Sequence, residues 1–235
     1  MELYMMTNIS NKKFLLFLHS NKKFLIFILL MSVFRSAVAD WYSVPTGSMK
    51  PTIQEGDRII VNKIAYDVRL PFTDISLLPI ATPKRGEIVV FESEAADLRL
   101  IKRVIGLPGD IVEMNNELIR VNGQDLSYKD SRTYIDQANS AEITTSTEKI
   151  DNILHSIDID NSASNRLSNF APVTVPVGHY LVLGDNRRHS ADSRVYGFVP
   201  HQELRGKATA IAFSVDYANY YLPRSDRFFL DIYDI

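Results

Sequence analysis

Short segments rich in β-branched and aromatic residues, each bounded by turn-forming residues, constrain the fold of this chain most strongly. These segments cover residues 58–62, 87–91, 98–105, 111–114, 118–121, 180–183 and 208–214. Asn122-Gly123 is a strong hairpin dipeptide, and Pro108-Gly109 marks another turn. Helical periodicity is weak beyond the N-terminus. The pattern therefore predicts a mostly β fold with coiled or barrel-like sheets.

Composition changes sharply near the N-terminus. Residues 24–39 form an apolar run, interrupted by Arg35, that is close in length to a membrane-spanning helix of roughly 17–25 residues. Lysines precede this run at positions 12, 13, 22 and 23. Because positive charge gathers on the cytoplasmic side of a membrane helix, we expect residues 1–23 to be cytoplasmic. Residues 24–39 would then be a transmembrane anchor, with the rest of the chain outside.

The same N-terminal residues fit a second interpretation. Lysines, an apolar core and the small residues Ala37-Val38-Ala39 are also typical of a cleavable secretory signal. Both interpretations place residues 40–235 beyond the membrane. They differ in whether that part of the chain stays attached.

The segment 126–173 differs in composition from its surroundings. It is rich in Ser, Thr, Asn and Asp and has few sustained apolar patterns. A structureless loop of this length is uncommon inside a compact domain. We therefore expect a smaller, variable inserted lobe at 126–173 between two halves of one catalytic core, 40–125 and 174–235.

Composition also excludes several classes of function. The 26 Lys and Arg residues against 28 Asp and Glu give a net charge of -2, whereas nucleic-acid binders usually carry a basic excess. The absence of cysteine excludes thiol nucleophiles, disulfides and thiolate metal sites. The five histidines are scattered without ligand spacing, and no glycine-rich phosphate loop is present. We expect no cofactor, no metal and no nucleic-acid partner.

Residues 45–52 read PTGSMKPT and place a candidate nucleophile, Ser48, directly after Gly47. A serine hydroxyl becomes nucleophilic when a neighbouring base removes its proton. Gly47 allows unusual backbone conformations and close approach of a substrate. The Thr46 hydroxyl and the Ser48 backbone N–H are suited to stabilising an oxyanion. The alternative is a simple turn, because Pro, Gly, Ser and Thr all favour loops.

The candidate base is Lys102, which strand alternation places on one face with Leu98, Leu100 and Val104. Apolar surroundings, to which Met49 beside the serine would add, would lower the pKa of the amine. To act as a base near neutral pH, that pKa must fall by about 3 units from roughly 10.4, a cost on the order of 4 kcal/mol. The alternative is a lysine whose amine reaches solvent at a sheet edge.

A third segment, residues 184–197, is densely polar and reads GDNRRHSADSRVYG. Asp192 and Arg194 are placed to form an ion pair, and the Ser190 hydroxyl could orient the lysine amine. The alternative is a solvated loop whose surface ion pairs contribute little stability.

Together these segments resemble the bacterial type I signal peptidases, also called leader peptidases. The resemblance rests on four ordered blocks, at residues 45–52, 56–63, 102–110 and 184–194, and leaves the insertion poorly matched. It implies Ser48 as nucleophile and Lys102 as general base, with the Thr46 hydroxyl assisting the oxyanion hole. It further implies that Ser190 orients the lysine.

The remaining implications of the resemblance concern support, substrate and location. Gly47 and Met49 flank the nucleophile, while Asp192 and Arg194 match a structural ion pair near the site. Members of the family have a mostly β catalytic core with a smaller variable lobe, and they cut exported preproteins after Ala-x-Ala-type sequences. The resemblance places the chain in the bacterial cytoplasmic membrane as a single-pass protein. Its partners would be signal-peptide-bearing preproteins and the lipid bilayer.

Three other functions stay open at this point. The chain could be a specialised peptidase of a conjugation or pilus system that matures one dedicated substrate. It could be a catalytically inactive exported binding domain. It could also be a Ser-His-Asp hydrolase, for which His189 is the one histidine within a motif block.

Overall fold

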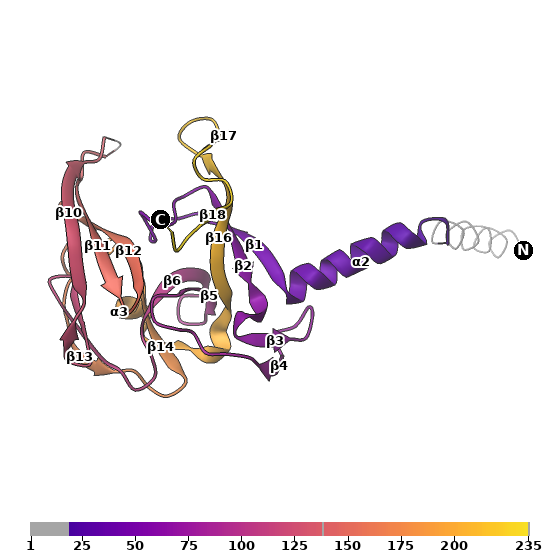
Figure 1. Cartoon of the computed structure of the whole chain (residues 1–235), viewed down its shortest axis with the longest axis horizontal. Coiled ribbons are helices and arrows are strands. Elements are labelled where there is room, and N and C mark those ends of the chain that lie inside the picture. The colour runs from indigo at the N-terminus through magenta and orange to yellow at the C-terminus, as the bar shows by residue number, and fades with distance from the viewer. Residues whose placement is uncertain (1–18, 138, 235) are drawn as a thin grey trace, which may run out of the picture.

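The largest sheet combines strands from both ends of the chain (Figure 1). The structure, a computed structural model, describes residues 19–137 and 139–234. Within these residues the sheet has the antiparallel order β1-β2-β16-β5-β6-β14-β15, and β17 and β18 pair with β16. The strands are β1 (Ala39–Ser43), β2 (Asp57–Asn62), β5 (Ile88–Ser93), β6 (Leu98–Gly106), β14 (His179–Leu183), β15 (Val199–Pro200), β16 (Leu204–Asp216), β17 (Leu222–Pro223) and β18 (Leu230–Asp231).

The central strands of this sheet are covered on both faces. Alternate residues of β2, including Ile59 and Val61, point into one hydrophobic cluster. In β5, Ile88 joins that same cluster whereas Val89 joins a second cluster on the other face. The C-terminal half of β6 is buried and pairs with β14, whereas its first residues pair with β5 and are exposed. Lys102 falls at the start of the buried half.

The other sheets are smaller. One has the order β13-β7-β8-β9, a second has the order β10-β11-β12, and β3 pairs with β4. Their bounds are β3 (Asp67–Arg69), β4 (Ser76–Pro79), β7 (Ile111–Asn115), β8 (Leu118–Val121), β9 (Gln124–Asp125), β10 (Ser127–Ile135), β11 (Glu142–Ile150), β12 (Ile153–Asp160) and β13 (Phe170–Thr174). Short helical turns occur at η1 (Lys63–Ala65), α3 (Ser193–Tyr196) and η2 (His201–Glu203). The mostly β fold expected from the sequence is confirmed.

The β10–β12 sheet occupies much of the segment expected to be an inserted lobe, and the sequence pattern did not predict its strands. Much of β10 is exposed, so apolar alternation is absent from its sequence. Hydroxyl pairs across the strands replace apolar contacts, as between Thr133 and Thr144 at 2.9 Å and between Ser131 and Ser146 at 2.8 Å. β13 lies in the same segment but pairs with β7. The domain boundaries at 126 and 173 stay a prediction.

The N-terminal apolar run forms α2 (Lys22–Ala37), which projects away from the sheets (Figure 1). It has 16 residues, and none of them is buried. The chain leaves the helix at Ala37 because Ala39 already pairs with Asn62 as the first residue of β1. In the described part of the chain, no helix is both long enough and apolar enough to cross a membrane. The transmembrane helix expected at 24–39 is therefore not found as such, and residues 1–18 of the expected cytoplasmic segment lie outside the described residues.

Candidate active site

Ser48 lies in the loop that joins β1 to β2, and buried side chains fix the shape of this loop. Met49 and Ile53 both pack into the core cluster beneath the sheet. The Ile53 N–H donates to the Met49 carbonyl at 2.9 Å, and the Lys50 N–H donates to the Gly47 carbonyl at 3.1 Å. Met49 therefore anchors the residue next to the serine. The backbone of Gly47 is not in the left-handed region, so the expected need for an unusual glycine conformation is not met there.

Lys102 and Ser48, 54 positions apart in the sequence, meet in the structure. Lys102 Nζ donates to Ser48 Oγ at 2.7 Å and to the Ile101 carbonyl at 2.9 Å. The lysine is 2% exposed, because β5 and β14 flank β6 on either side. A buried amine in contact with a serine hydroxyl is the arrangement that general-base activation requires.

Burial makes this amine a base near neutral pH. Loss of hydration lowers the pKa of Lys102 from 10.5 to about 8, and the Arg194 guanidinium contributes a smaller decrease. The carboxylates of Asp192 and Asp185 oppose the decrease because they favour the charged ammonium. With a pKa of about 8, roughly a tenth of Lys102 is neutral at pH 7 and about half at pH 8, and the neutral amine is the form that can accept a proton.

Asp192 and Arg194 form the expected ion pair. Arg194 Nε donates to Asp192 Oδ1 at 2.8 Å and Arg194 Nη2 donates to Asp192 Oδ2 at 2.6 Å, a two-point pairing of side chains that are nearly inaccessible to solvent. Asp192 also caps α3 through the Arg194 N–H and accepts from the Gly184 N–H at 3.0 Å. Arg194 reaches the carbonyls of Arg187 and Leu167. The pair thus holds the segment after β14 in place beside the lysine.

Ser190 lies beside the nucleophile loop but does not hydrogen-bond to the lysine. Its side chain is buried, and within the described residues its Oγ has no hydrogen-bond partner. Gly184 lies against it, since a Cβ at Gly184 would fall 2.2 Å from Ser190 Oγ and 2.4 Å from the Ser48 carbonyl oxygen. A glycine is therefore required at this close approach. The role of Ser190 in orienting Lys102 stays a prediction.

Three residues that the sequence reasoning did not assign hold the nucleophile loop. The Asn186 N–H donates to the Ser48 carbonyl at 3.1 Å, and its side-chain amide donates to the Gly47 carbonyl at 3.1 Å. Asp185 is buried, with Arg103 donating to both of its carboxylate oxygens. All three lie inside the sequence blocks 102–110 and 184–194, so the sequence indicated that they are near the site. It did not indicate their partners, because these depend on the fold.

The cleft that contains Ser48 is shared between the nucleophile loop and the β10–β12 sheet. Thr46 is exposed and lines this cleft together with Ser48, and its role in the oxyanion hole stays a prediction. His189 also lines it, where its Nε2 lies 2.7 Å from Asp160 Oδ2. The base in contact with Ser48 is Lys102, so the structure favours the serine–lysine pair over a histidine-based hydrolase.

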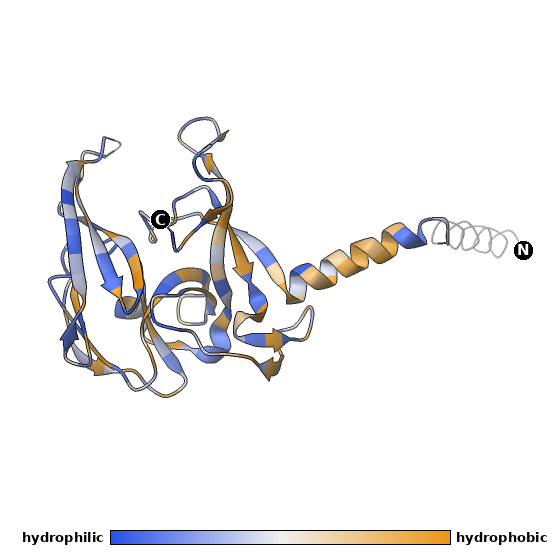
Figure 2. Ribbon diagram, viewed as in Figure 1, coloured by the Kyte–Doolittle hydropathy of each residue, from blue (hydrophilic) through white to orange (hydrophobic). Residues whose placement is uncertain are grey.

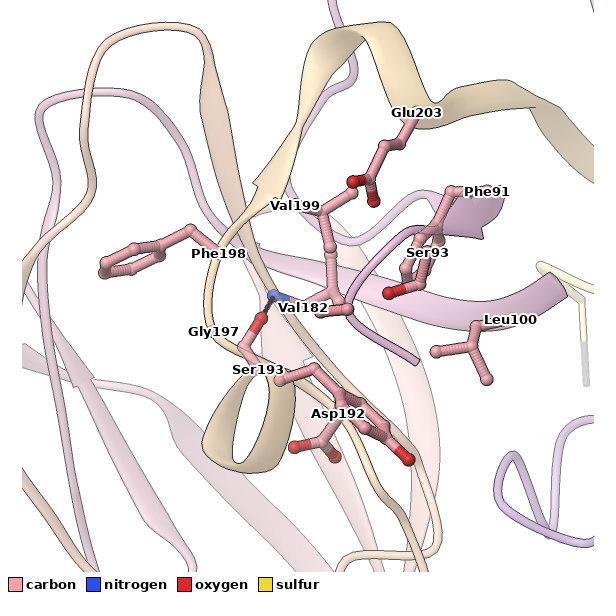
Figure 3. A pocket seen from close by; sticks show the side chains of 12 residues that line it. Phe91, Ser93, Leu100, Val182, Asp192, Ser193, Gly197, Phe198, Val199 and Glu203 are labelled. Atoms are coloured by element: carbon pink, nitrogen blue, oxygen red, sulfur yellow. Dashed lines mark hydrogen bonds between the residues drawn. The ribbon is translucent and has the colours of Figure 1, made fainter. Parts of the chain in front are cut away.

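A second, smaller pocket lies behind Asp192 (Figure 3). Leu100, Val182 and Phe91 surround it together with Asp192. Its volume of about 20 Å³ has room for one group the size of a water molecule. The cleft that contains Ser48 is much larger, at about 290 Å³. Across residues 19–137 and 139–234, no group of three or more His, Cys, Asp or Glu side chains is arranged to hold a metal ion.

The chain is similar to a known family over most of its length. Residues 18–213 match the family described as signal peptidase, peptidase S26. Signal peptidase I of Pseudomonas aeruginosa is 36% identical over 196 residues, covering 78% of this chain and 68% of the relative. Signal peptidase I of Rickettsia typhi is 36% identical over 209 residues, covering 80% of this chain and 76% of the relative.

A solved structure is also similar in sequence. The signal peptidase I of Enterococcus faecalis is 34% identical and covers 55% of this chain and 97% of its own, with a TM-score of 0.34. The family match and the two long alignments decide the assignment. This chain belongs to the bacterial type I signal peptidases of the peptidase S26 family and is a serine endopeptidase.

Proposed function

We propose that this protein removes N-terminal signal peptides from exported preproteins by cutting after small residues, with Ser48 as nucleophile and Lys102 as general base. The observation that carries the proposal is the 2.7 Å contact between the Nζ of Lys102, which is nearly inaccessible to solvent, and the Oγ of Ser48, which is half-buried and lines the cleft. The family match supports signal-peptide processing as the reaction.

The reaction takes two steps. Neutral Lys102 accepts the proton of Ser48 as Oγ attacks the scissile carbonyl, and the Ser48 N–H with the Thr46 hydroxyl stabilises the resulting oxyanion. The tetrahedral intermediate collapses, the new amino terminus leaves with the proton from Lys102, and an acyl-enzyme on Ser48 remains. Lys102 then removes a proton from water, which releases the signal peptide and restores Ser48.

We also propose that α2 holds the enzyme at the bacterial cytoplasmic membrane, with the N-terminus in the cytoplasm and the β sheets on the outer side. Its large apolar side chains are exposed along the helix, and Figure 2 shows α2 as a largely hydrophobic ribbon that projects away from the sheets. An unpartnered apolar helix of this kind requires lipid or another apolar surface. The lysines before the helix support this orientation.

Retention of the helix is favoured over its removal. The bond between Ala39 and Asp40, where a secretory signal would be cut, lies inside β1. Both residues pair with β2, at Asn62 and Val61, and the Val38 carbonyl accepts from the Lys63 N–H at 2.9 Å. A peptide bond held in a sheet is a poor protease site, and the intact mass of the membrane-extracted protein tests this directly.

The deciding experiment is an assay of the full chain in detergent on a peptide with an Ala-x-Ala sequence before the scissile bond. We expect cleavage after the second alanine, and loss of at least 10³-fold in Ser48→Ala and Lys102→Ala. Lack of cleavage by the wild type would favour a non-catalytic role. Rescue of a strain depleted of its general signal peptidase would distinguish a general enzyme from one dedicated to a single substrate.

A further inference from the structure

The wall of the cleft opposite Ser48 is one face of the β10–β12 sheet. Tyr134 and Ile143 are directly paired across β10 and β11, so their side chains share a face, and both line the cleft with Ser48. Asp158 and Asp160 of β12 line it as well. The neighbouring residue Ile135 is 58% exposed and does not line the cleft, as strand alternation requires. Substrate bound at Ser48 must pass this wall.

The β10–β12 sheet is fixed relative to the nucleophile by a short backbone chain. The Asp158 N–H donates to the Asp185 carbonyl at 2.9 Å, and the Arg187 N–H donates to the Asp158 carbonyl at 2.9 Å. Asn186, which lies between these two residues, donates to the Ser48 carbonyl. One segment of three residues therefore binds both walls of the cleft.

A buried ion pair strengthens the same connection. Arg187 Nη2 donates to Glu148 Oε1 of β11 at 2.6 Å, and both side chains are almost inaccessible. The pairing with Arg187 and His155 holds the pKa of Glu148 well below its usual range, despite burial that acts in the opposite direction. The sheet is thus attached rigidly enough to present a defined surface to a substrate.

The position of the sheet indicates which part of the substrate it meets. In Figure 1, α2 leaves the large sheet on one side and the β10–β12 sheet stands on the opposite side. The apolar signal peptide belongs on the side of α2, where the enzyme would meet the membrane. The residues beyond the scissile bond then point toward the β10–β12 sheet.

We infer that Tyr134 and Ile143 bind the substrate segment C-terminal to the scissile bond, through apolar contact with its first residues. The inference rests on the proposed function and adds to it a second recognition surface, supplied by the least strongly patterned part of the sequence. It makes the β10–β12 sheet a determinant of which preproteins are cut efficiently.

Two substrates with the same residues up to the scissile bond test this inference on the full chain in detergent. One continues for ten residues of a mature sequence, and the other carries an aminomethylcoumarin amide in place of those residues. In Tyr134→Ala and Ile143→Ala we expect kcat/KM to fall tenfold or more on the long substrate, mainly through KM. The short substrate should be cut within twofold of the wild-type rate.

Matched variants complete the test. Ile135→Ala removes an exposed apolar side chain from the same strand and should change neither rate, and Tyr134→Phe should retain activity on the long substrate. An equal fall on both substrates, or no fall on the long one, overturns the inference while leaving the peptidase activity established. Failure of the wild type to cut either substrate overturns the proposed function itself.

Discussion

Lys102 Nζ donates a hydrogen bond to Ser48 Oγ at 2.7 Å, from a strand whose first half is exposed and whose second half is buried. The position of Lys102 at this boundary explains how the amine can be buried from solvent and still reach the loop that carries the serine. At such a distance proton transfer needs no intervening water. The proposed reaction would therefore depend on the protonation state of this one amine.

The activity should follow the ionisation of Lys102. Burial lowers the pKa of this amine to about 8, and the charged form cannot accept the serine proton. We expect kcat/KM to fall about tenfold per pH unit below pH 8 and to level off above it. Initial rates between pH 6 and pH 10, on a peptide without ionising side chains, measure this profile. A profile that is flat from pH 6 to pH 9 would exclude Lys102 as the base.

Lys102 should also cost the protein stability at neutral pH. Its folded pKa of about 8 lies below the value of 10.5 for the unfolded chain, so the unfolded state binds more protons between these values. The stability of the wild type should therefore rise with pH through this window, by about 3 kcal/mol in total.

Replacement of the lysine removes that dependence. Lys102→Met lacks the buried amine, so its unfolding free energy should exceed that of the wild type at pH 7. This difference should shrink by about 3 kcal/mol between pH 7 and pH 10.5. Urea unfolding at several pH values measures this difference. Lys149→Met, at an exposed position of β11, is the control and should show almost none. Parallel curves for wild type and Lys102→Met would contradict burial of the amine.

The core strands and the position of Lys102 among them were predictable from the sequence for the same reason. Buried strands such as residues 87–91 carry apolar residues on both faces, and a lysine among leucine and valine is conspicuous in such a pattern. The strands of the β10–β12 sheet could not be recognised this way. Their cross-strand contacts include hydroxyl pairs, and a single strand of Thr and Ser shows no periodicity that would reveal its partner.

The supporting contacts of the site were less predictable than its reactive groups. Asn186 binds Ser48 through backbone groups, and such a contact cannot be recognised from the amino-acid type at either position. The pair Arg103–Asp185 joins residues 82 positions apart, and the sequence alone offers several equally charged partners for each. Likewise, the N-terminal helix ends at Ala37, two residues before the expected end at 39, because β1 pairs with β2, which is a tertiary constraint.

Gly184 should be intolerant of any side chain. In Gly184→Ala the added Cβ would need to lie 2.4 Å from the Ser48 carbonyl oxygen, so the nucleophile loop must move. A displacement near 1 Å at a reacting group costs on the order of 10²-fold in rate. We expect a loss of kcat of that size, measured on the peptide substrate. Gly123→Ala is the control, since its left-handed backbone is strained by a Cβ but no atom lies within 4 Å of one.

Removal of the Asp192 charge should have two separable effects. Asp192→Asn leaves the buried Arg194 without its carboxylate, which should reduce the unfolding free energy by about 3–5 kcal/mol. Because the Asp192 carboxylate raises the pKa of Lys102, its loss should also move the acid limb of the pH–rate profile to lower pH. Glu113→Gln, which breaks an exposed ion pair with Arg120, should do neither. An acid limb that stays in place would show that Asp192 and Lys102 are not coupled.

Ser190→Ala distinguishes a role of the Ser190 hydroxyl in turnover from a role in stability. Within the described residues Ser190 Oγ is buried and makes no hydrogen bond, so its removal should leave the unfolding free energy unchanged or raise it by up to about 1 kcal/mol. If the hydroxyl orients the Lys102 amine during turnover, kcat should nevertheless fall tenfold or more, because an amine that is free to rotate spends less time aimed at Ser48. Thermal unfolding and peptide cleavage on the same preparation give both values, with Ser190→Thr testing whether a hydroxyl at this position restores the rate. Full activity in Ser190→Ala would limit the lysine's orientation to its contacts with Ser48 and the Ile101 carbonyl.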